Sequence, residues 1–174
     1  MITLEPFEKP DFDTLISWID SEQTLVQFAG FIFNFPLTAQ QLYRYLEDKK
    51  RFAYKVVELP ANQTIGHAEI FLPGNKTAAL CRIIIGNPGN RNHGYGEQII
   101  NTLLDISFNQ LNADKAELNV FEWNIPAIKC YEKAGFVIND ERTQERKVNK
   151  EIWTALNMGI DKVKWENLKA IAVI

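Results

Sequence analysis

Two kinds of hydrophobic periodicity alternate along the chain. Short runs in which apolar or β-branched residues dominate alternate positions predict β-strands over 52–58, 64–72, 78–85 and 115–121. Apolar residues recur every third or fourth position over 97–111, which predicts a long amphipathic helix. Shorter segments predict strands at 2–5, 136–138 and 151–158, and helices after Asp11, after Thr38 and over 126–134.

The order of these elements predicts a mixed α/β fold. Three successive strands between residues 52 and 85 favour an antiparallel meander. The strand, loop, helix and strand between 78 and 121 favour a right-handed parallel crossover. The aromatic stretch over 28–36 follows neither period and is expected to be irregular. A chain of 174 residues fits one domain, and we assign 1–174 to it.

Composition and charge argue against several classes of protein. The formal net charge is -3 and the basic residues are scattered, so we expect no nucleic-acid partner. No apolar stretch reaches the ~20 residues that span a bilayer, and the start lacks the pattern of a signal peptide. We therefore expect a cytoplasmic protein without membrane contact. Cys81 and Cys130 lie too far apart for a disulfide framework or a zinc spacing, and no metal site is expected.

A glycine-rich loop joins the β-branched strand to the long helix. Its last six residues are Arg91, Asn92, His93, Gly94, Tyr95 and Gly96. Backbone N–H groups at a helix start lack internal partners, the helix dipole favours an anion there, and glycines allow a close approach. The loop therefore predicts a phosphate site. It lacks the Lys and Ser or Thr of a P-loop and the third small residue of a dinucleotide fingerprint.

The Arg-x-x-Gly-x-Gly pattern of this loop resembles the pyrophosphate loop of the GNAT N-acetyltransferases. The segment 115–136 resembles the strand and helix that follow in that family, through Leu118, Val120, Asn124, Ala127, Tyr131, Glu132, Lys133, Gly135 and Phe136. The ends of the chain resemble the Rim-type branch, whose members acetylate ribosomal protein N-termini, polyamines and other small amines. The resemblance implies the GNAT fold: a mixed, twisted sheet of about seven strands, splayed in the middle, with helices on both faces.

The resemblance also implies a reaction and a cofactor site. The reaction is direct transfer of an acetyl group from acetyl-CoA to a primary amine, without a metal. The loop residues 91–96 would hold the pyrophosphate. The pantetheine arm would add to the bulged strand end at Ile83, Ile84 and Ile85, with Asn124 as a hydrogen-bond partner. Tyr131 would be the general acid that protonates the leaving thiolate.

Weaker signals suggest the general base and the acceptor site. Glu69 shares a strand face with His67, beside the strand that meets the cofactor, and is the first candidate for the base; Glu122 is the alternative. A covalent route through Cys130 is conceivable, but the family usually transfers directly. Aromatic residues of the variable acceptor region are candidates for substrate binding: Phe28, Phe31, Phe33 and Tyr43.

Several alternatives stay open at this stage. A GNAT-fold module that binds acetyl-CoA with little or no turnover would carry the same loop, and so would a regulator that binds another phosphate compound. The acceptor is a protein N-terminus, a polyamine or another small amine. The protein is a monomer or a homodimer; the apolar tail 170–174, on an exposed last strand, would allow pairing with a second copy.

Overall fold

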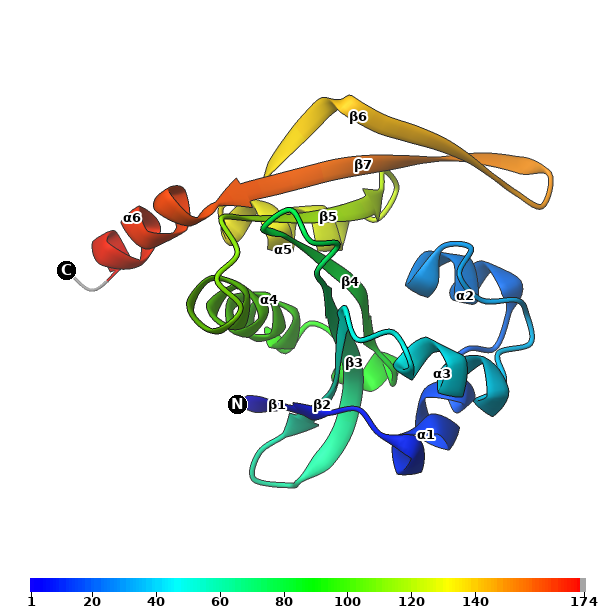
Figure 1. The fold of residues 1–174 in the computed structure, drawn as a ribbon. Helices are drawn as coiled ribbons and strands as arrows, with labels where there is room; N and C mark the ends of the chain where they lie inside the picture. Colours follow the sequence, from blue (N-terminus) through cyan, green and yellow to red (C-terminus); the bar gives the residue numbers. More distant parts are fainter. Residues whose placement is uncertain (173–174) are drawn as a thin grey trace.

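In the computed structural model, which describes residues 1–172, seven strands form one mixed sheet (Figure 1). They are β1 (Ile2–Pro6), β2 (Arg51–Glu58), β3 (Gln63–Phe71), β4 (Thr77–Ile85), β5 (Lys115–Phe121), β6 (Val137–Val148) and β7 (Glu151–Asp161). Their order in the sheet is β1-β2-β3-β4-β5-β7-β6. Among the strands of residues 1–172, β4 and β5 alone pair in parallel, as the predicted crossover requires.

Helices cover both faces of this sheet. They are α1 (Phe12–Ser17), α2 (Glu22–Ala29), α3 (Ala39–Leu46), α4 (Tyr95–Asp105), α5 (Ile125–Lys133) and α6 (Lys162–Ala172). Figure 1 shows α1, α2 and α3 on one side of strands β2 to β4, and α4 on the other. Each side has its own buried hydrophobic cluster. The mixed sheet with helices on both faces confirms the predicted fold class.

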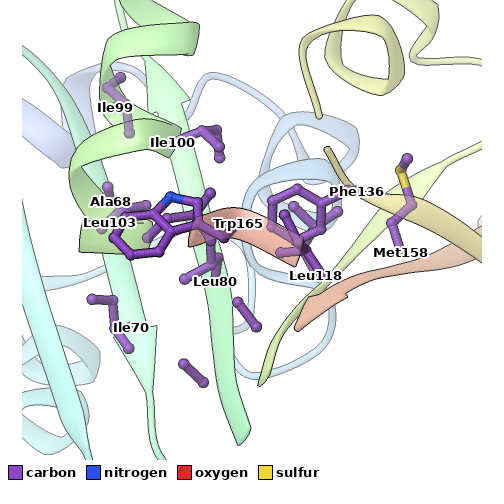
Figure 2. Close-up of a cluster of buried hydrophobic side chains, with 14 of the residues drawn as sticks. Ala68, Ile70, Leu80, Ile99, Ile100, Leu103, Leu118, Phe136, Met158 and Trp165 are labelled. Carbon is purple, nitrogen blue, oxygen red and sulfur yellow. The ribbon is translucent and has the colours of Figure 1, made fainter. Parts of the chain in front are cut away.

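The amphipathic pattern of α4 explains how this helix is held against the sheet. Its residues Ile99, Ile100 and Leu103 are fully buried and belong to the same cluster as Ile70 and Leu80 of the strands (Figure 2). Burying side chains of this size contributes about 1.5–3 kcal/mol each. This packing holds α4 against the sheet. The glycine-rich loop between β4 and α4 is therefore held at both ends.

Helix α2 was not predicted, although the sequence carries its signals. The Ser21 side chain accepts a hydrogen bond from the Thr24 backbone N–H at 3.2 Å, which caps the helix. Leu25, Phe28 and Ala29 follow at helical spacing and are buried. The aromatic stretch that begins at Phe28 conceals this pattern. The Thr38 cap of α3 was predicted correctly, since its hydroxyl accepts from the Gln41 N–H.

The C-terminal part departs from the prediction. Strand β6 extends to Val148, well beyond the predicted 136–138. Its second half is polar and exposed, so hydrophobic periodicity gives no sign of it. Residues 170–172 belong to α6, a helix anchored by the buried Trp165 against Phe108 at 5.1 Å between ring centroids. Strand β7 lies between β5 and β6 and is not an edge. The last strand is thus not exposed at an edge, and the described part of the tail is helical. Pairing of two copies through a strand there has no basis in residues 1–172, and residues 173–174 lie outside the described part.

Within residues 1–172, no helix is long and apolar enough to cross a membrane. No group of His, Cys, Asp and Glu side chains in the same range is arranged to hold a metal ion.

Candidate active site

Strands β4 and β5 separate partway along their length. They pair only from Thr77 with Lys115 to Ala79 with Glu117. Beyond Ala79, the edge of β4 that faces β5 has no paired strand. The separation opens into a cleft of ≈ 1150 Å³, lined by both strands, α2 and α5. A cleft of this size holds a cofactor-sized ligand.

The cleft brings together predicted residues that are distant in sequence. Those that line it are Ile83, Ile84, Arg91, Asn124, Tyr131, Phe28 and Phe31. The remaining predicted residues do not line it. Phe33 is buried against Tyr45 at 5.4 Å, and Tyr43 packs edge-on against Phe12 at 5.1 Å. Half of the aromatic candidates for the acceptor site therefore belong to the packing of α1 and α3.

A β-bulge interrupts β4 where the strand enters the cleft. The pairing with β3 passes from Glu69 opposite Cys81 to His67 opposite Ile84, so β4 has one residue more than β3 over this stretch. Arg82, inside the bulge, has φ +49°, a left-handed conformation that strains a residue with a side chain. The resemblance implied both the bulge and the separation of β4 from β5, and the structure shows both.

The glycine-rich loop ends at the N-terminus of α4. Gly94 is the N-cap with φ +75°, where a side chain would be strained although a Cβ would meet no atom within 4 Å. The Tyr95 hydroxyl donates to a Glu58 carboxylate oxygen at 2.5 Å, which ties the helix start to β2. The Arg91 guanidinium lies 3.5 Å from the Ile85 carbonyl oxygen. Free helix-start N–H groups beside an exposed arginine fit a pyrophosphate.

Tyr131 approaches the cleft from α5. Burial raises the pKa of its hydroxyl well above the ordinary value, and the neighbouring Cys130 raises it further. The hydroxyl therefore stays protonated at physiological pH, which suits a proton donor. Asn124 caps the same helix, since its side-chain oxygen accepts from the Ala127 N–H at 3.4 Å, and it also lines the cleft.

Glu69 does not have the geometry of a general base. Its side chain is fully buried and does not line the cleft. One carboxylate oxygen accepts from Arg51 at 2.9 Å and from Arg82 at 2.8 Å, and the other contacts Arg82 and the Tyr45 hydroxyl. Because four donors occupy both oxygens, Glu69 has no free site for a proton from an amine.

The other candidates for proton transfer or covalent chemistry lie outside the cleft. Glu122 is exposed and is not among the residues that line it. Cys130 is half-buried, and its Sγ lies 3.5 Å from the point where a Cβ on Gly96 would stand. Burial raises the pKa of its thiol, which disfavours the reactive thiolate. Neither residue reaches the space where the substrates would meet.

Several residues that shape the cleft were not predicted from the sequence. Trp18 closes one wall against Gly86, where a Cβ would lie only 2.0 Å from the indole ring. Asp20, Arg82 and Arg146 also line the cleft. Asp20 precedes the unpredicted α2, and Arg146 lies in the polar half of β6. Placing α2 from its Ser21 cap would have drawn attention to Asp20.

A family model of the GNAT acetyltransferase domain matches residues 1–137, so the chain belongs to the GNAT acetyltransferases. Its fold is similar to that of a spermidine N-acetyltransferase from Vibrio cholerae solved with CoA and spermine. The two share 24% identity and a TM-score of 0.80, over 95% of this chain and 98% of the other. A dodecameric form of the spermidine enzyme gives 24% identity and a TM-score of 0.77, over 95% and 96% of the chains.

Family membership and the cleft together define an acetyl-CoA-dependent N-acetyltransferase. The chain acts on an amine. At these identities the solved structures establish the fold.

His67 predicts a loss of stability in acid. Burial lowers the pKa of its imidazole from 6.5 to about 4. The hydrogen bond with the Arg82 carbonyl and the charges of Glu69 and Asp11 oppose this shift, whereas the charge of the Arg82 guanidinium adds to it. Between these two values the unfolded chain binds a proton that the folded chain does not, so stability falls as the pH falls. We expect the free energy of unfolding to drop by about 2–3 kcal/mol between pH 7 and pH 4.5 from this group.

Urea unfolding at several pH values measures this drop. A His67→Gln variant serves as the comparison, because it has no imidazole to protonate. Between pH 6.5 and pH 4.5, the free energy of unfolding of the variant should fall less steeply than that of the wild type. An unchanged slope in the variant would assign the acid sensitivity to other groups.

Proposed function

We propose that this chain transfers the acetyl group of acetyl-CoA directly to a primary amine, with both substrates bound in the cleft between β4 and β5. The cleft itself carries the proposal. It joins the unpaired edge of β4, Arg91 of the glycine-rich loop, Tyr131 and the aromatic residues Phe28 and Phe31. One cavity thus offers a place for the cofactor arm, a proton donor and a wall for the acceptor.

The residues that would hold acetyl-CoA follow from the geometry. The helix-start N–H groups after Gly94, together with Arg91, would bind its phosphates. The unpaired edge of β4 over Ile83 and Ile84 would bind the pantetheine arm by adding it as a further strand. A backbone N–H on this edge would stabilise the negative charge that develops on the thioester oxygen. Acetyl-CoA supplies an already activated thioester, so alignment of the two substrates provides much of the rate.

Proton transfer divides between Tyr131 and solvent. As the amine nitrogen bonds to the acetyl carbon, the carbon–sulfur bond breaks and the sulfur takes the Tyr131 proton. The nitrogen releases its surplus proton to water, and water reprotonates Tyr131. The raised pKa of Tyr131 keeps the donor loaded between turnovers.

The enclosed geometry of Glu69 leads us to propose a reaction without a protein base. An α-amino group has a pKa of about 7.7–8.0, so a fair fraction is neutral near pH 7.5. Asp20 is the one acidic residue that lines the cleft among the described residues. Hydrogen bonds from Thr24 and Ser21 lower the pKa of Asp20, so it stays ionised. An ionised Asp20 suits holding the acceptor's ammonium group and is a poor proton acceptor.

The charges of the cleft favour an acceptor with a single amine on an apolar or peptide body. Three arginines line the cleft, but Arg82 is paired with the buried Glu69 and Arg91 is assigned to the phosphates of acetyl-CoA. The charges left beside the acceptor are Arg146 and the single carboxylate of Asp20. A polyamine carries several positive charges and needs complementary carboxylates. Phe31 is 59% exposed and offers an apolar surface instead. A peptide N-terminus fits this combination.

Initial rates with a short peptide that has a free N-terminus, compared with spermidine, test the proposal. We expect kcat/KM to favour the peptide by about 10-fold or more, since like charges in a cleft cost binding energy. The same peptide with a blocked N-terminus is the control and should give no product. With the free peptide, the rate should rise with pH around about 7.7–8.0, following the amine. A preference for spermidine would contradict the proposed acceptor class.

A further inference from the structure

The β4 bulge is held by a buried polar group that the reaction itself does not use. The Arg82 carbonyl oxygen lies 2.8 Å from Nδ1 of His67. Nε2 of His67 is buried and has no hydrogen-bond partner among the described residues. Because a carbonyl only accepts, Nδ1 carries the proton of the neutral ring and donates it to Arg82. The rings of Phe7 and Phe28, at 4.7 and 5.5 Å, fix the imidazole edge-on.

The side chain of Arg82 is fixed as firmly as its carbonyl. Its guanidinium makes two contacts with Glu69, and the side chains are 8% and 0% exposed. Arg51 and the Tyr45 hydroxyl bind the same carboxylate from β2 and α3. Removing one member would leave buried charge without a partner, so the group forms as a unit.

Regular pairing of β4 with β3 would give a different cleft. A shift of one residue turns every following side chain and backbone N–H to the opposite side of a strand. Without the extra residue at Arg82, the side chains and backbone N–H groups of Ile83 and Ile84 would point to the opposite sides. Those that now face the cleft would then face away from it. The left-handed conformation of Arg82 costs energy, so the bulge needs other interactions to stabilise it.

We propose that His67, Glu69 and Arg82 form a bulge latch. These three positioning residues hold β4 in the register that presents Ile83 and Ile84 to the cofactor and the reacting carbonyl. Tyr45 connects the latch to α3, on the same side of the sheet as the acceptor wall. The effect of the latch on rate rests on the proposed function. Glu69 then has a positioning role and not one in proton transfer.

Kinetics of Glu69→Gln, Arg82→Gln and the double variant test the latch. Each single variant should lower kcat by about 10²-fold, the scale of a misplacement of about 1 Å. The dissociation constant of acetyl-CoA should rise by a smaller factor than kcat falls, because the latch aligns only the pantetheine arm and the helix N-terminus still binds the phosphates. The double variant should be no worse than either single one, because both break the same unit. Arg82→Lys keeps the charge and should recover part of the rate.

The matched control is Arg142→Gln. Arg142 also pairs with a glutamate, donating to Glu117 at 2.5 Å, but it lies outside the cleft and the bulge. This variant should keep the wild-type kcat. Tyr45→Phe removes only one donor to Glu69 and gives a milder test if the charge variants fold poorly. It should lower kcat in the same direction without changing the shape of the pH profile.

Hydrogen exchange separates the latch from the proposed reaction. Backbone amides of 82–84 should exchange faster in Arg82→Gln than in the wild type, a result that needs no activity. A wild type that binds acetyl-CoA but acetylates no amine would defeat the proposed function and leave this measurement valid. Wild-type exchange and kcat in Arg82→Gln would overturn the latch. Multiplied losses in the double variant, or a changed pH profile in Glu69→Gln alone, would overturn it as well.

Discussion

A Tyr131→Phe variant should lose acetyl transfer by about 10²-fold or more in kcat, the scale of general acid catalysis. The ring still fills its place beside Phe136, at 6.2 Å between centroids, so packing is retained. Only the hydroxyl, the proposed proton donor to the departing thiolate, is lost. Because the phosphate loop is untouched, the dissociation constant of acetyl-CoA should stay nearly unchanged. Steady-state kinetics together with calorimetric binding measures both quantities.

Tyr54→Phe is the matched control for the loss of a tyrosine hydroxyl. Tyr54 is half-buried in β2, burial raises its pKa, and it does not line the cleft. We expect this variant to retain the wild-type kcat. If Tyr131→Phe also kept full activity, another group or water would have to protonate the thiolate. A wild type without turnover would instead favour the binding-module alternative.

A Gly94→Glu variant should lose acetyl-CoA affinity by about 10²-fold or more, because like charges brought together cost several kcal/mol. The new carboxylate would stand at the N-terminus of α4, where the phosphates are expected to bind. The left-handed backbone of Gly94 adds strain for any side chain. Isothermal titration calorimetry with acetyl-CoA measures the loss.

Two comparisons separate charge from strain. Gly74→Glu introduces the same side chain at another left-handed glycine, φ +113°, where a Cβ also meets no atom within 4 Å and which does not line the cleft. It should bind acetyl-CoA like the wild type. Gly94→Ala adds strain without charge and should weaken binding far less than Gly94→Glu. Equal losses in both Gly94 variants would mean that loop conformation, and not phosphate repulsion, controls affinity.

Local signals in the sequence were enough to predict the frame of the site. The glycines at 94 and 96 and the period of α4 define a strand, loop and helix wherever the rest of the chain lies. The Asn124 cap and the position of Tyr131 on the following helix are local in the same sense. These features depend on residues a few positions apart, which a single sequence displays.

The roles of Glu69 and Arg82 could not be predicted in this way. Alternation along β3 correctly placed Glu69 and His67 on one face, but it gave no sign of which partners lie opposite. Those partners come from α3, β2 and the β4 bulge, and the bulge alone reverses the direction of the side chains that follow. Register between strands is a property of the folded sheet, so a carboxylate that alternation suggested as a base is enclosed by two arginines and a tyrosine.

The long β6 shows the same limit in a different form. Its residues from Asn139 to Lys147 are mostly exposed and polar, so no hydrophobic period marks them. Asn139 and residues 144–147 pair with β7, with an irregularity over 140–143, and this pairing brings Arg146 to the cleft. The acceptor side of the cleft therefore depends on pairing between distant segments, and its charge could be assessed only from the folded chain.

Calorimetric titration of the folded wild-type protein with acetyl-CoA measures whether the cleft binds this cofactor. The cleft, the helix N-terminus at Gly94 and the open edge of β4 predict saturable binding at one site per chain, with a dissociation constant on the order of micromolar. CoA should compete for the same site. If a well-folded sample gave no binding heat with acetyl-CoA and no competition by CoA, the cleft would not be an acetyl-CoA site, and the GNAT fold would serve another ligand here.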